Sequence, residues 1–171
     1  TAFSDSMHSL TQGSAMNRTF RYTGLLAPKV DLARLKAETL AQPQYEPVTT
    51  HHFFGGLYGR EVYRDAGVLV IGRVHKKAHF YQLIQGSVLI TQEGEEPKRV
   101  DAPALIRSHP GTERAVFSLT PATCITWHAT SATTPEEAEA ELLEPDESSA
   151  YTADNKVKPG FLKMERQEVL Q

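Results

Sequence analysis

The chain has 171 residues, of which 40% are hydrophobic and 23% charged, a composition that suits one compact domain and excludes a disordered chain, a collagen-like repeat or a coiled coil. The formal net charge of −3 excludes nucleic acid as the main partner, because binding to phosphates needs a concentrated basic surface. With a single cysteine, no secretory signal and no apolar run near the roughly 18 residues of a membrane span, we expect a soluble, intracellular protein that contacts no membrane.

Residues 1–29 are rich in Ser, Thr, Met and Gly and have no sustained hydrophobic period. A segment of this composition buries little apolar surface of its own. It predicts an extended N-terminal arm that is held by contacts with a neighbouring molecule.

Residues 30–50 predict a short helix followed by a linker. Asp31 stands where a side chain accepts hydrogen bonds from the first turn of a helix, and two leucines three residues apart share one face. Pro43 and Pro47 then end the helix and force an extended link.

Residues 51–130 change from a helical period to the period of two that is typical of β-strands. Turn residues, mostly glycine or proline, separate short segments at 56–64, 68–75, 79–84, 87–92, 98–100, 104–108, 114–119 and 124–129. Such spacing predicts a mainly β protein, a single antiparallel β-sandwich or jelly-roll barrel, rather than βαβ units.

Residues 131–171 predict an acidic helix and a C-terminal tail. Thr134 supplies a capping hydroxyl, Pro135 suits the first turn, and the helix should run to Leu143 and stop before Pro145. We interpret the acidic run as a solvated helix face, with a docking strip for a basic partner as the alternative. The tail is expected to pack on the body or on a neighbour.

The most informative stretch lies between Gly67 and Gly86. Alternate residues of a strand share a face, so Arg73 and His75 are expected to point together, and His79 joins them from the next strand after a tight lysine turn. Three polar side chains would then converge in the mouth of the barrel, where small-molecule sites form.

This stretch resembles the first motif of the cupin superfamily, the RmlC-like jelly rolls, which is written G-x5-H-x-H-x3,4-E-x6-G. On that motif Arg73 takes the first histidine position, His75 the second, and His79 the glutamate position. A Pro-Gly-Thr-Glu-Arg run resembles the second motif with one residue missing, and places Arg114 at the last histidine ligand. The resemblance covers residues 58–130 and implies a jelly roll whose family metal site has three histidines and one glutamate.

Two guanidiniums in these positions argue against a metal ion, because they are permanently cationic and only donate hydrogen bonds. A divalent ion 4 Å from one of them would meet a repulsion of roughly 8 kcal/mol at an effective dielectric near 20. We therefore expect no bound cofactor, and keep a metal on His75 and His79 as the alternative.

The same residues suit a carboxylate or phosphate, which planar guanidinium forks bind well. The predicted anion site consists of Arg73, His75, His79 and Arg114. A structural role is the other interpretation, in which an inward arginine ties strands together by pairing with Glu61, Asp101 or Glu113.

The remaining histidines and the cysteine carry weaker signals. Neighbours in a strand face opposite ways, which does not suit a metal pair, so we expect His51 and His52 to lie in a loop or at a sheet edge. We place His109 in a turn and His128 near the end of its strand, and we interpret Cys124 as a buried filler without an adjacent base.

A narrower resemblance is to the cupin-like proteins encoded by tailed bacteriophages, whose strand pattern is close to YxRE…AG…GxxHK…G…AP…PGTxR. The matching residues here are Tyr58 to Glu61, Ala66 and Gly67, Gly72 to Lys76, Gly86, Ala102 and Pro103, and Pro110 to Arg114. It implies a non-enzymatic structural or assembly protein of a virion, either a capsid-decoration or a tail- or connector-associated component.

Such a protein would contact copies of itself and other virion proteins through the N-terminal arm and the C-terminal tail. It would be found in the virion, or in the host cytoplasm during assembly. The alternatives are a metal-dependent cupin enzyme or sensor acting on a small acid, and a carbohydrate- or anion-binding module.

Overall fold

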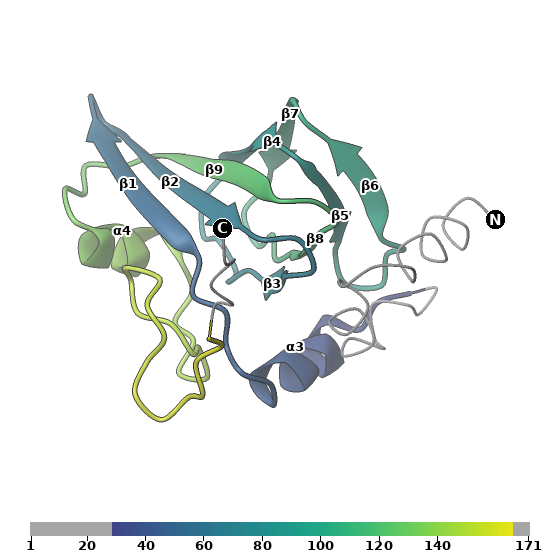
Figure 1. Ribbon diagram of the computed structural model, residues 1–171. Helices are drawn as coiled ribbons and strands as arrows, with labels where there is room; N and C mark the ends of the chain where they lie inside the picture. Colours follow the sequence, from purple (N-terminus) through teal and green to yellow (C-terminus); the bar gives the residue numbers. More distant parts are fainter. Residues whose placement is uncertain (1–28, 166–171) are drawn as a thin grey trace, which may run out of the picture.

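The computed structural model describes residues 29–165 of the chain, which form two helices and nine strands (Figure 1). The helices are α3 (Leu32–Leu40) and α4 (Pro135–Leu142). The strands are β1 (Val48–Phe54), β2 (Leu57–Arg64), β3 (Leu69–Ile71), β4 (His79–Gln85), β5 (Ser87–Thr91), β6 (Lys98–Asp101), β7 (Ala104–Ser108), β8 (Ala115–Ser118) and β9 (Ala122–Ala129). Neither of these helices is long and apolar enough to cross a membrane.

The strands form two antiparallel sheets whose pairing is nested. Strand β2 pairs with β9, β3 with β8, β4 with β7, and β5 with β6. One sheet has the order β1-β2-β9-β4-β7 and the other β3-β8-β5-β6, so that the chain alternates between them. Eight strands in this order are a jelly roll. The fold predicted from the sequence is confirmed.

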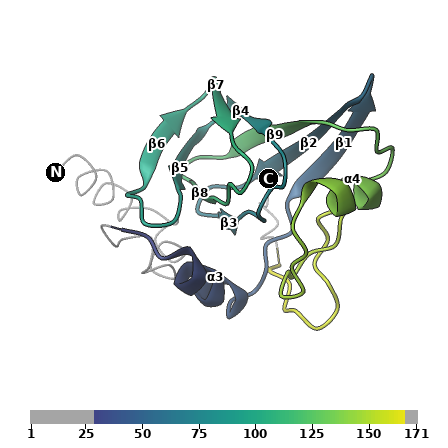
Figure 2. The same cartoon turned by 180° about the vertical axis from the view of Figure 1, so that it is seen from behind.

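The space between the sheets is filled by alternate residues of the facing strands. Leu83 and Val88 are fully buried there, and Val116 is 6% exposed. Helix α3 covers the outer face of the smaller sheet, where Leu35 packs in a cluster that includes Phe117. Figure 2 shows this helix below β3 and β8, well away from α4.

Both helices begin at the caps that the sequence predicts. The Asp31 carboxylate accepts a hydrogen bond from the Arg34 amide at 2.9 Å. The Thr134 hydroxyl accepts one from the Glu137 amide at 3.3 Å. Helix α4 then buries one face against the β1–β2 hairpin, in a cluster with Tyr58. Both predicted helices are confirmed.

The prediction of one strand from residue 68 to residue 75 is wrong. Regular pairing ends at Ile71, because tertiary contacts take over the backbone that follows. The Val74 carbonyl accepts from the Glu144 amide at 2.9 Å, and the Lys76 amide donates to the Leu142 carbonyl at 2.8 Å. On its other side the segment still bonds to the chain that leads into β8, since the Gly72 amide donates to the Arg114 carbonyl at 2.8 Å and the His75 amide to the Thr112 carbonyl at 3.2 Å. The segment therefore lies between the end of α4 and residues 111–114 as an irregular extension of β3.

Strand β1 begins at Val48, inside the predicted linker, and continues as an edge strand paired with β2. It carries His51 and His52, which therefore lie at the sheet edge, one of the two placements expected for them.

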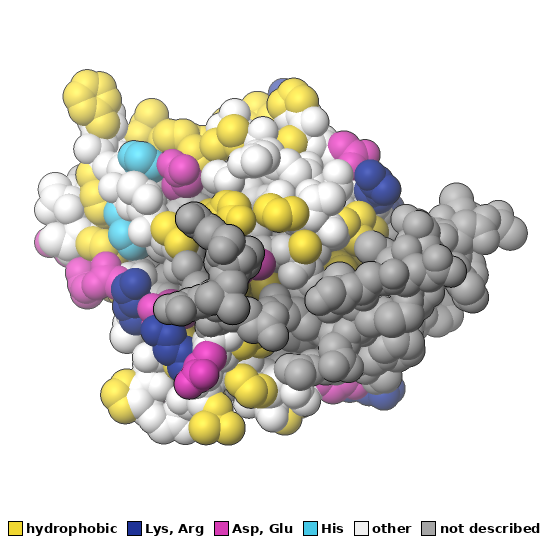
Figure 3. Space-filling model, in the orientation of Figure 1, with side chains coloured by type: hydrophobic (Ala, Val, Ile, Leu, Met, Phe, Trp, Pro, Cys, Tyr) yellow, Lys and Arg dark blue, Asp and Glu magenta, His cyan; other side chains and the backbone are white. Residues whose placement is uncertain are grey.

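The described part of the C-terminal tail packs back on the linker, as expected. The Tyr151 hydroxyl donates to the Tyr45 carbonyl at 2.7 Å, and the Glu46 carboxylate accepts from the Val157 amide at 3.0 Å. Acidic and basic side chains lie next to one another around this segment (Figure 3). The predicted N-terminal arm lies outside the described residues, except for Lys29.

Candidate functional site

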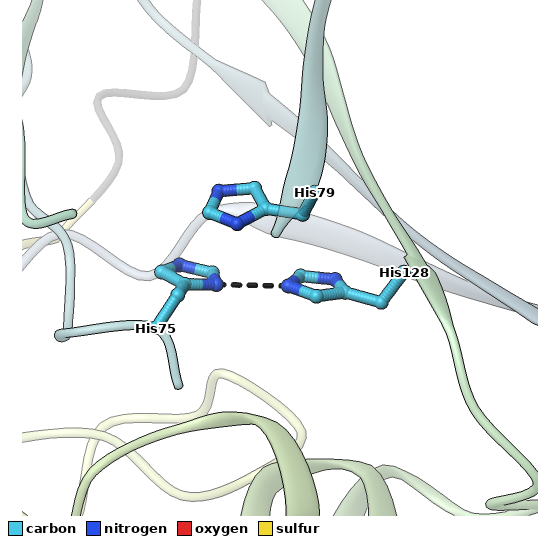
Figure 4. A group of neighbouring side chains, drawn as sticks. All are labelled: His75, His79 and His128. Carbon is cyan, nitrogen blue, oxygen red and sulfur yellow. Dashed lines mark hydrogen bonds between the residues drawn. The ribbon is translucent and has the colours of Figure 1, made fainter. Parts of the chain in front are cut away.

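Three histidines meet inside one end of the jelly roll. His79 is the first residue of β4, and His128 is the last residue but one of β9, the strand beside it. His75 arrives from the irregular segment between β3 and β4, which is anchored by its bridge to Leu143 after α4. Figure 4 shows the three imidazole rings directed toward one another from these separate elements.

The rings are in direct contact. One ring nitrogen from each histidine lies within 4.8 Å of the other two. His75 Nδ1 and His128 Nε2 are 2.9 Å apart and share a hydrogen bond. The ring centroid of His79 is 4.0 Å from that of His75 and 4.6 Å from that of His128. We call these residues the histidine cluster.

The histidine cluster is neutral at pH 7. Burial, and then the nearby His79 and His128, lower the pKa of His75 to about 2. Burial and the nearby His79 lower the pKa of His128 to about 4. Burial also lowers the pKa of His79, although its hydrogen bond to Lys77 opposes this shift. Neutral imidazole is the form that binds metal ions.

One member of the cluster, His79, also makes the outer hydrogen bond that is typical of a ligating histidine. His79 Nδ1 lies 3.1 Å from the Lys77 carbonyl, which only accepts, so Nδ1 carries the proton and Nε2 the lone pair. A contact of this kind fixes the tautomer of a ligating histidine. His128 Nδ1 is buried without a hydrogen-bond partner. These residues fit a transition-metal ion, with the hydrogen bond between His75 and His128 giving way to coordination.

Guanidinium groups line the interior next to the cluster. Arg60 lies on the inward face of β2, opposite Thr126, and its Nε atom is buried without a partner. Arg114 donates from Nη1 to the Ser108 hydroxyl at 2.6 Å. Ser108 is the register partner of His79. The charges of both arginines contribute to the low pKa of His75.

A third guanidinium lies further along the interior. Arg64 is 3% exposed and donates from Nη2 to the Tyr81 hydroxyl at 3.2 Å and to Cys124 Sγ at 3.3 Å. Burial raises the pKa of Tyr81, so its hydroxyl keeps its proton at pH 7. Cys124 is buried, as predicted.

The structure brings together three of the four residues of the predicted anion site. His75 and His79 stack on one another, and Arg114 lies beside them. Arg73, the fourth, is bound by the end of α4 instead. Its Nη1 is 2.6 Å from the Glu139 carboxylate and its Nη2 donates to the Glu144 carbonyl at 2.6 Å. A structural role would require an inward arginine to pair with a carboxylate. Within the described residues, Arg114 has no carboxylate partner and binds the Ser108 hydroxyl.

Sequence reasoning missed two residues of the site, His128 and Arg60. The signal for His128 was present, because Cys124 was predicted to be buried and His128 lies four residues later on the same face of one strand. The expectation of no metal ion had assumed two histidines beside Arg73 and Arg114. The third imidazole, His128, completes a set of three nitrogen ligands that this expectation lacked. Two guanidiniums still lie beside the cluster, with Arg60 in place of Arg73, so a cation there is still repelled by both.

No protein-family model matches the sequence, and no curated protein matches it. Solved structures do match. An RmlC-like cupin family protein of Methanocaldococcus jannaschii with a double-stranded β-helix fold is 10% identical, with a TM-score of 0.44 over 49% of this chain and 80% of that chain. A cupin superfamily protein of Desulfitobacterium hafniense is 10% identical, with a TM-score of 0.44 over 56% and 87%.

An acetylacetone dioxygenase of Acinetobacter johnsonii is 13% identical, with a TM-score of 0.43 over 50% of this chain and 61% of that chain. The jelly-roll fold is established by the strand order of the chain itself. None of these three structures is described as a bacteriophage protein.

Proposed function

We propose that the protein binds one divalent transition-metal ion through His75, His79 and His128 and acts as a metal-dependent enzyme or sensor for a small acid. The observation that carries this proposal is the convergence of three neutral imidazoles, with ring nitrogens within 4.8 Å of one another. Imidazole suits zinc, iron, nickel and copper, and three protein ligands leave coordination positions open for water or substrate.

The side chains around the cluster have separate tasks in this proposal. A bound ion would act as a Lewis acid on a substrate oxygen or on a water molecule. Arg114 and Arg60 would orient an acidic substrate by charge-assisted hydrogen bonds. The Tyr81 hydroxyl, whose pKa burial raises, is a neutral donor at pH 7. The hydrogen bond of His79 to the Lys77 carbonyl holds one imidazole in the ligating tautomer.

Elemental analysis and thermal unfolding of the full chain test this proposal. We expect about one metal ion per chain after incubation with Zn²⁺, Ni²⁺ or Fe²⁺ and desalting. At a metal concentration roughly 100 times Kd, Tm should rise by about 5 to 10 °C, and a chelator should reverse the rise.

Two variants identify the ligands. His128→Gln and His79→Gln each remove an imidazole while keeping a polar side chain, and each should abolish the rise in Tm. His109→Ala is the matched control, because His109 is exposed in a turn and lies outside the cluster. Less than roughly a tenth of a metal ion per chain, with no effect of the chelator, would end this proposal.

The role in virion assembly, expected from the phage-type pattern, stays a prediction. It depends on residues 1–29, of which only Lys29 is described. Deleting residues 1–28 tests it independently of the histidine cluster. The truncated protein should fold, bind metal ions as before and fail to enter particles, whereas unchanged incorporation would refute that role.

A further inference from the structure

Three arginines of the jelly-roll interior have no carboxylate partner among the described residues. They are Arg60, Arg64 and Arg114. The Nε atoms of Arg60 and Arg64 are buried without any hydrogen bond. The polar contacts that the other guanidinium atoms do make are to neutral groups, the Ser108 and Tyr81 hydroxyls and the Cys124 sulfur. The interior therefore carries positive charge that the described protein does not neutralise.

Three other arginines among residues 29–165 are paired with carboxylates, whereas Arg107 is exposed to solvent. Arg34 binds Glu38 at 3.1 Å, Arg73 binds Glu139 at 2.6 Å, and Arg99 binds Asp101 at 3.0 Å. Glu139 is within electrostatic reach of Arg60, but its carboxylate is bound by Arg73.

Taking a charge out of water without a partner costs several kcal/mol. Natural proteins keep buried charges without a partner mainly at functional sites, where a ligand supplies the missing partner. Several guanidiniums without carboxylate partners inside one small jelly roll are therefore best explained by a ligand of opposite charge.

Two of the three arginines adjoin the histidine cluster. Arg60 is the register partner of Thr126, two residues before His128. Arg114 is held by the hydroxyl of Ser108, which is the register partner of His79. The two guanidiniums thus reach the cluster from β2 and from the segment just before β8, which belong to opposite sheets.

We propose that the interior of the jelly roll binds a small organic anion with at least two acidic groups, which Arg60 and Arg114 hold beside the histidine cluster. Arg64 lies deeper, behind the Tyr81 hydroxyl, and adds a third fixed positive charge. A single carboxylate would leave most of this charge unbalanced, whereas a dicarboxylate, tricarboxylate or phosphate balances it. The anion is the class of substrate that the proposed function would act on. Its position beside a metal ion rests on the proposed function.

The anion and the metal ion should strengthen each other's binding. A divalent cation beside two guanidiniums is repelled by both, and an anion placed between them offsets that repulsion. By linkage, the factor by which the anion tightens metal binding equals the factor by which the metal tightens anion binding.

Calorimetric titration of the full-length, metal-free protein tests the inference. The probes are malonate, citrate and inorganic phosphate, with acetate as the singly charged control. We expect at least one multiply charged probe to bind about tenfold or more tightly than acetate, since each charge-assisted hydrogen bond contributes substantially to affinity. Comparison of malonate and citrate with phosphate decides between a carboxylate and a phosphate ligand.

Arg60→Gln and Arg114→Gln should each weaken binding of the preferred probe about tenfold or more. Arg107→Gln is the matched control, because Arg107 is exposed on β7 and outside the interior. Equal weakening in Arg107→Gln would mean that the anions bind to the general surface charge, and would overturn the inference. Failure of every probe to bind at millimolar concentration would also overturn it.

The two proposals fail separately. Anion binding without metal binding would refute the proposed function and retain the anion site. Metal binding by His75, His79 and His128 without anion binding would support the proposed function and refute the anion site. If both ligands bind, the Kd for Zn²⁺ measured with saturating anion should be lower than without it, and an unchanged Kd would refute the placement of the anion beside the histidine cluster.

Discussion

Strand β4 runs from His79, in the histidine cluster, to Leu83, which is fully buried between the two sheets. Strand β9, beside it, runs the opposite way, from the buried Ala122 to His128. The same two strands thus line an apolar end and a polar end of one interior. The apolar end includes Leu83, Val88, Val116 and Ala122, and the polar end includes Arg60, His75, His79 and His128.

The difference between the ends separates stability from function. At the apolar end, burial of hydrocarbon side chains stabilises the fold. At the polar end, neutral histidines and unpaired guanidiniums are desolvated, which opposes folding. Strand alternation decides which residues face inward, but not whether they are apolar or polar. The stabilisation from burial at the apolar end can therefore offset the free-energy cost of burying polar groups at the other end.

Truncation at the apolar end should have the largest effect on stability. Leu83→Ala should lower the free energy of unfolding by about 2 to 5 kcal/mol, because it leaves a cavity between the sheets. Urea denaturation measures this change. Leu105→Ala, at a site that is 61% exposed, is the control and should change stability by less than about 0.5 kcal/mol. Similar losses of stability in both variants would show that burial at the apolar end stabilises the fold no more than an exposed site does.

Removal of the buried charge of Arg64, which is the register partner of Ala122 at the apolar end, should have the opposite sign. Arg64→Met replaces an unpaired, 3% exposed guanidinium with an apolar side chain of similar length. We expect the free energy of unfolding to rise by about 1 kcal/mol in the absence of added anions, as when buried charges are replaced by hydrophobic residues. A loss of stability in the same urea assay would mean that the contacts to Tyr81 and Cys124 outweigh the desolvation of the charge.

The smallest effect is expected at an ion pair outside the interior. Lys36 on α3 donates to Asp146, which follows α4, at 2.5 Å, and so connects the two helices that lie over different parts of the jelly roll. Burial raises the pKa of Asp146, but hydrogen bonds from Lys36 and Ser148 outweigh it and lower the pKa to about 2. Asp146→Asn should lower the free energy of unfolding by about 0.5 kcal/mol at pH 7, because both side chains are partly exposed and solvent screens the pair.

The pH dependence of that loss follows from the direction of the shift. A carboxyl group with a lowered pKa stabilises the folded state above its ordinary pKa of 3.8, and this contribution disappears as the pH falls through about 2. The difference between wild type and Asp146→Asn should therefore be constant from pH 5 to 7 and vanish near pH 2. A difference that persists at pH 2 would show that the pair contributes through packing instead of charge.

Local signals in the sequence predicted most of the fold. Asp31 and Thr134 cap the helices that they were expected to cap, and the turn residues separate most of the strands correctly. The segment after Ile71 was not predictable in this way, because contacts with the end of α4 decide its path. The contact of Arg73 with α4 was not predictable for the same reason, since its partner Glu139 lies on that helix. His75 and His79 depended only on short-range spacing and were brought together as expected.

The nested strand order also bears on when the histidine cluster is assembled. His128 lies opposite Tyr58, in the pair β2–β9 that joins the first and last strands of the jelly roll. Pairs between strands that are distant along the chain close late and slowly, because the entropy of closing a long loop opposes them. During synthesis, a nascent chain whose β9 is still inside the ribosome holds His75 and His79 without their third partner. A metal ion that required all three imidazoles would therefore bind after β9 has paired and would not guide the earlier steps of folding.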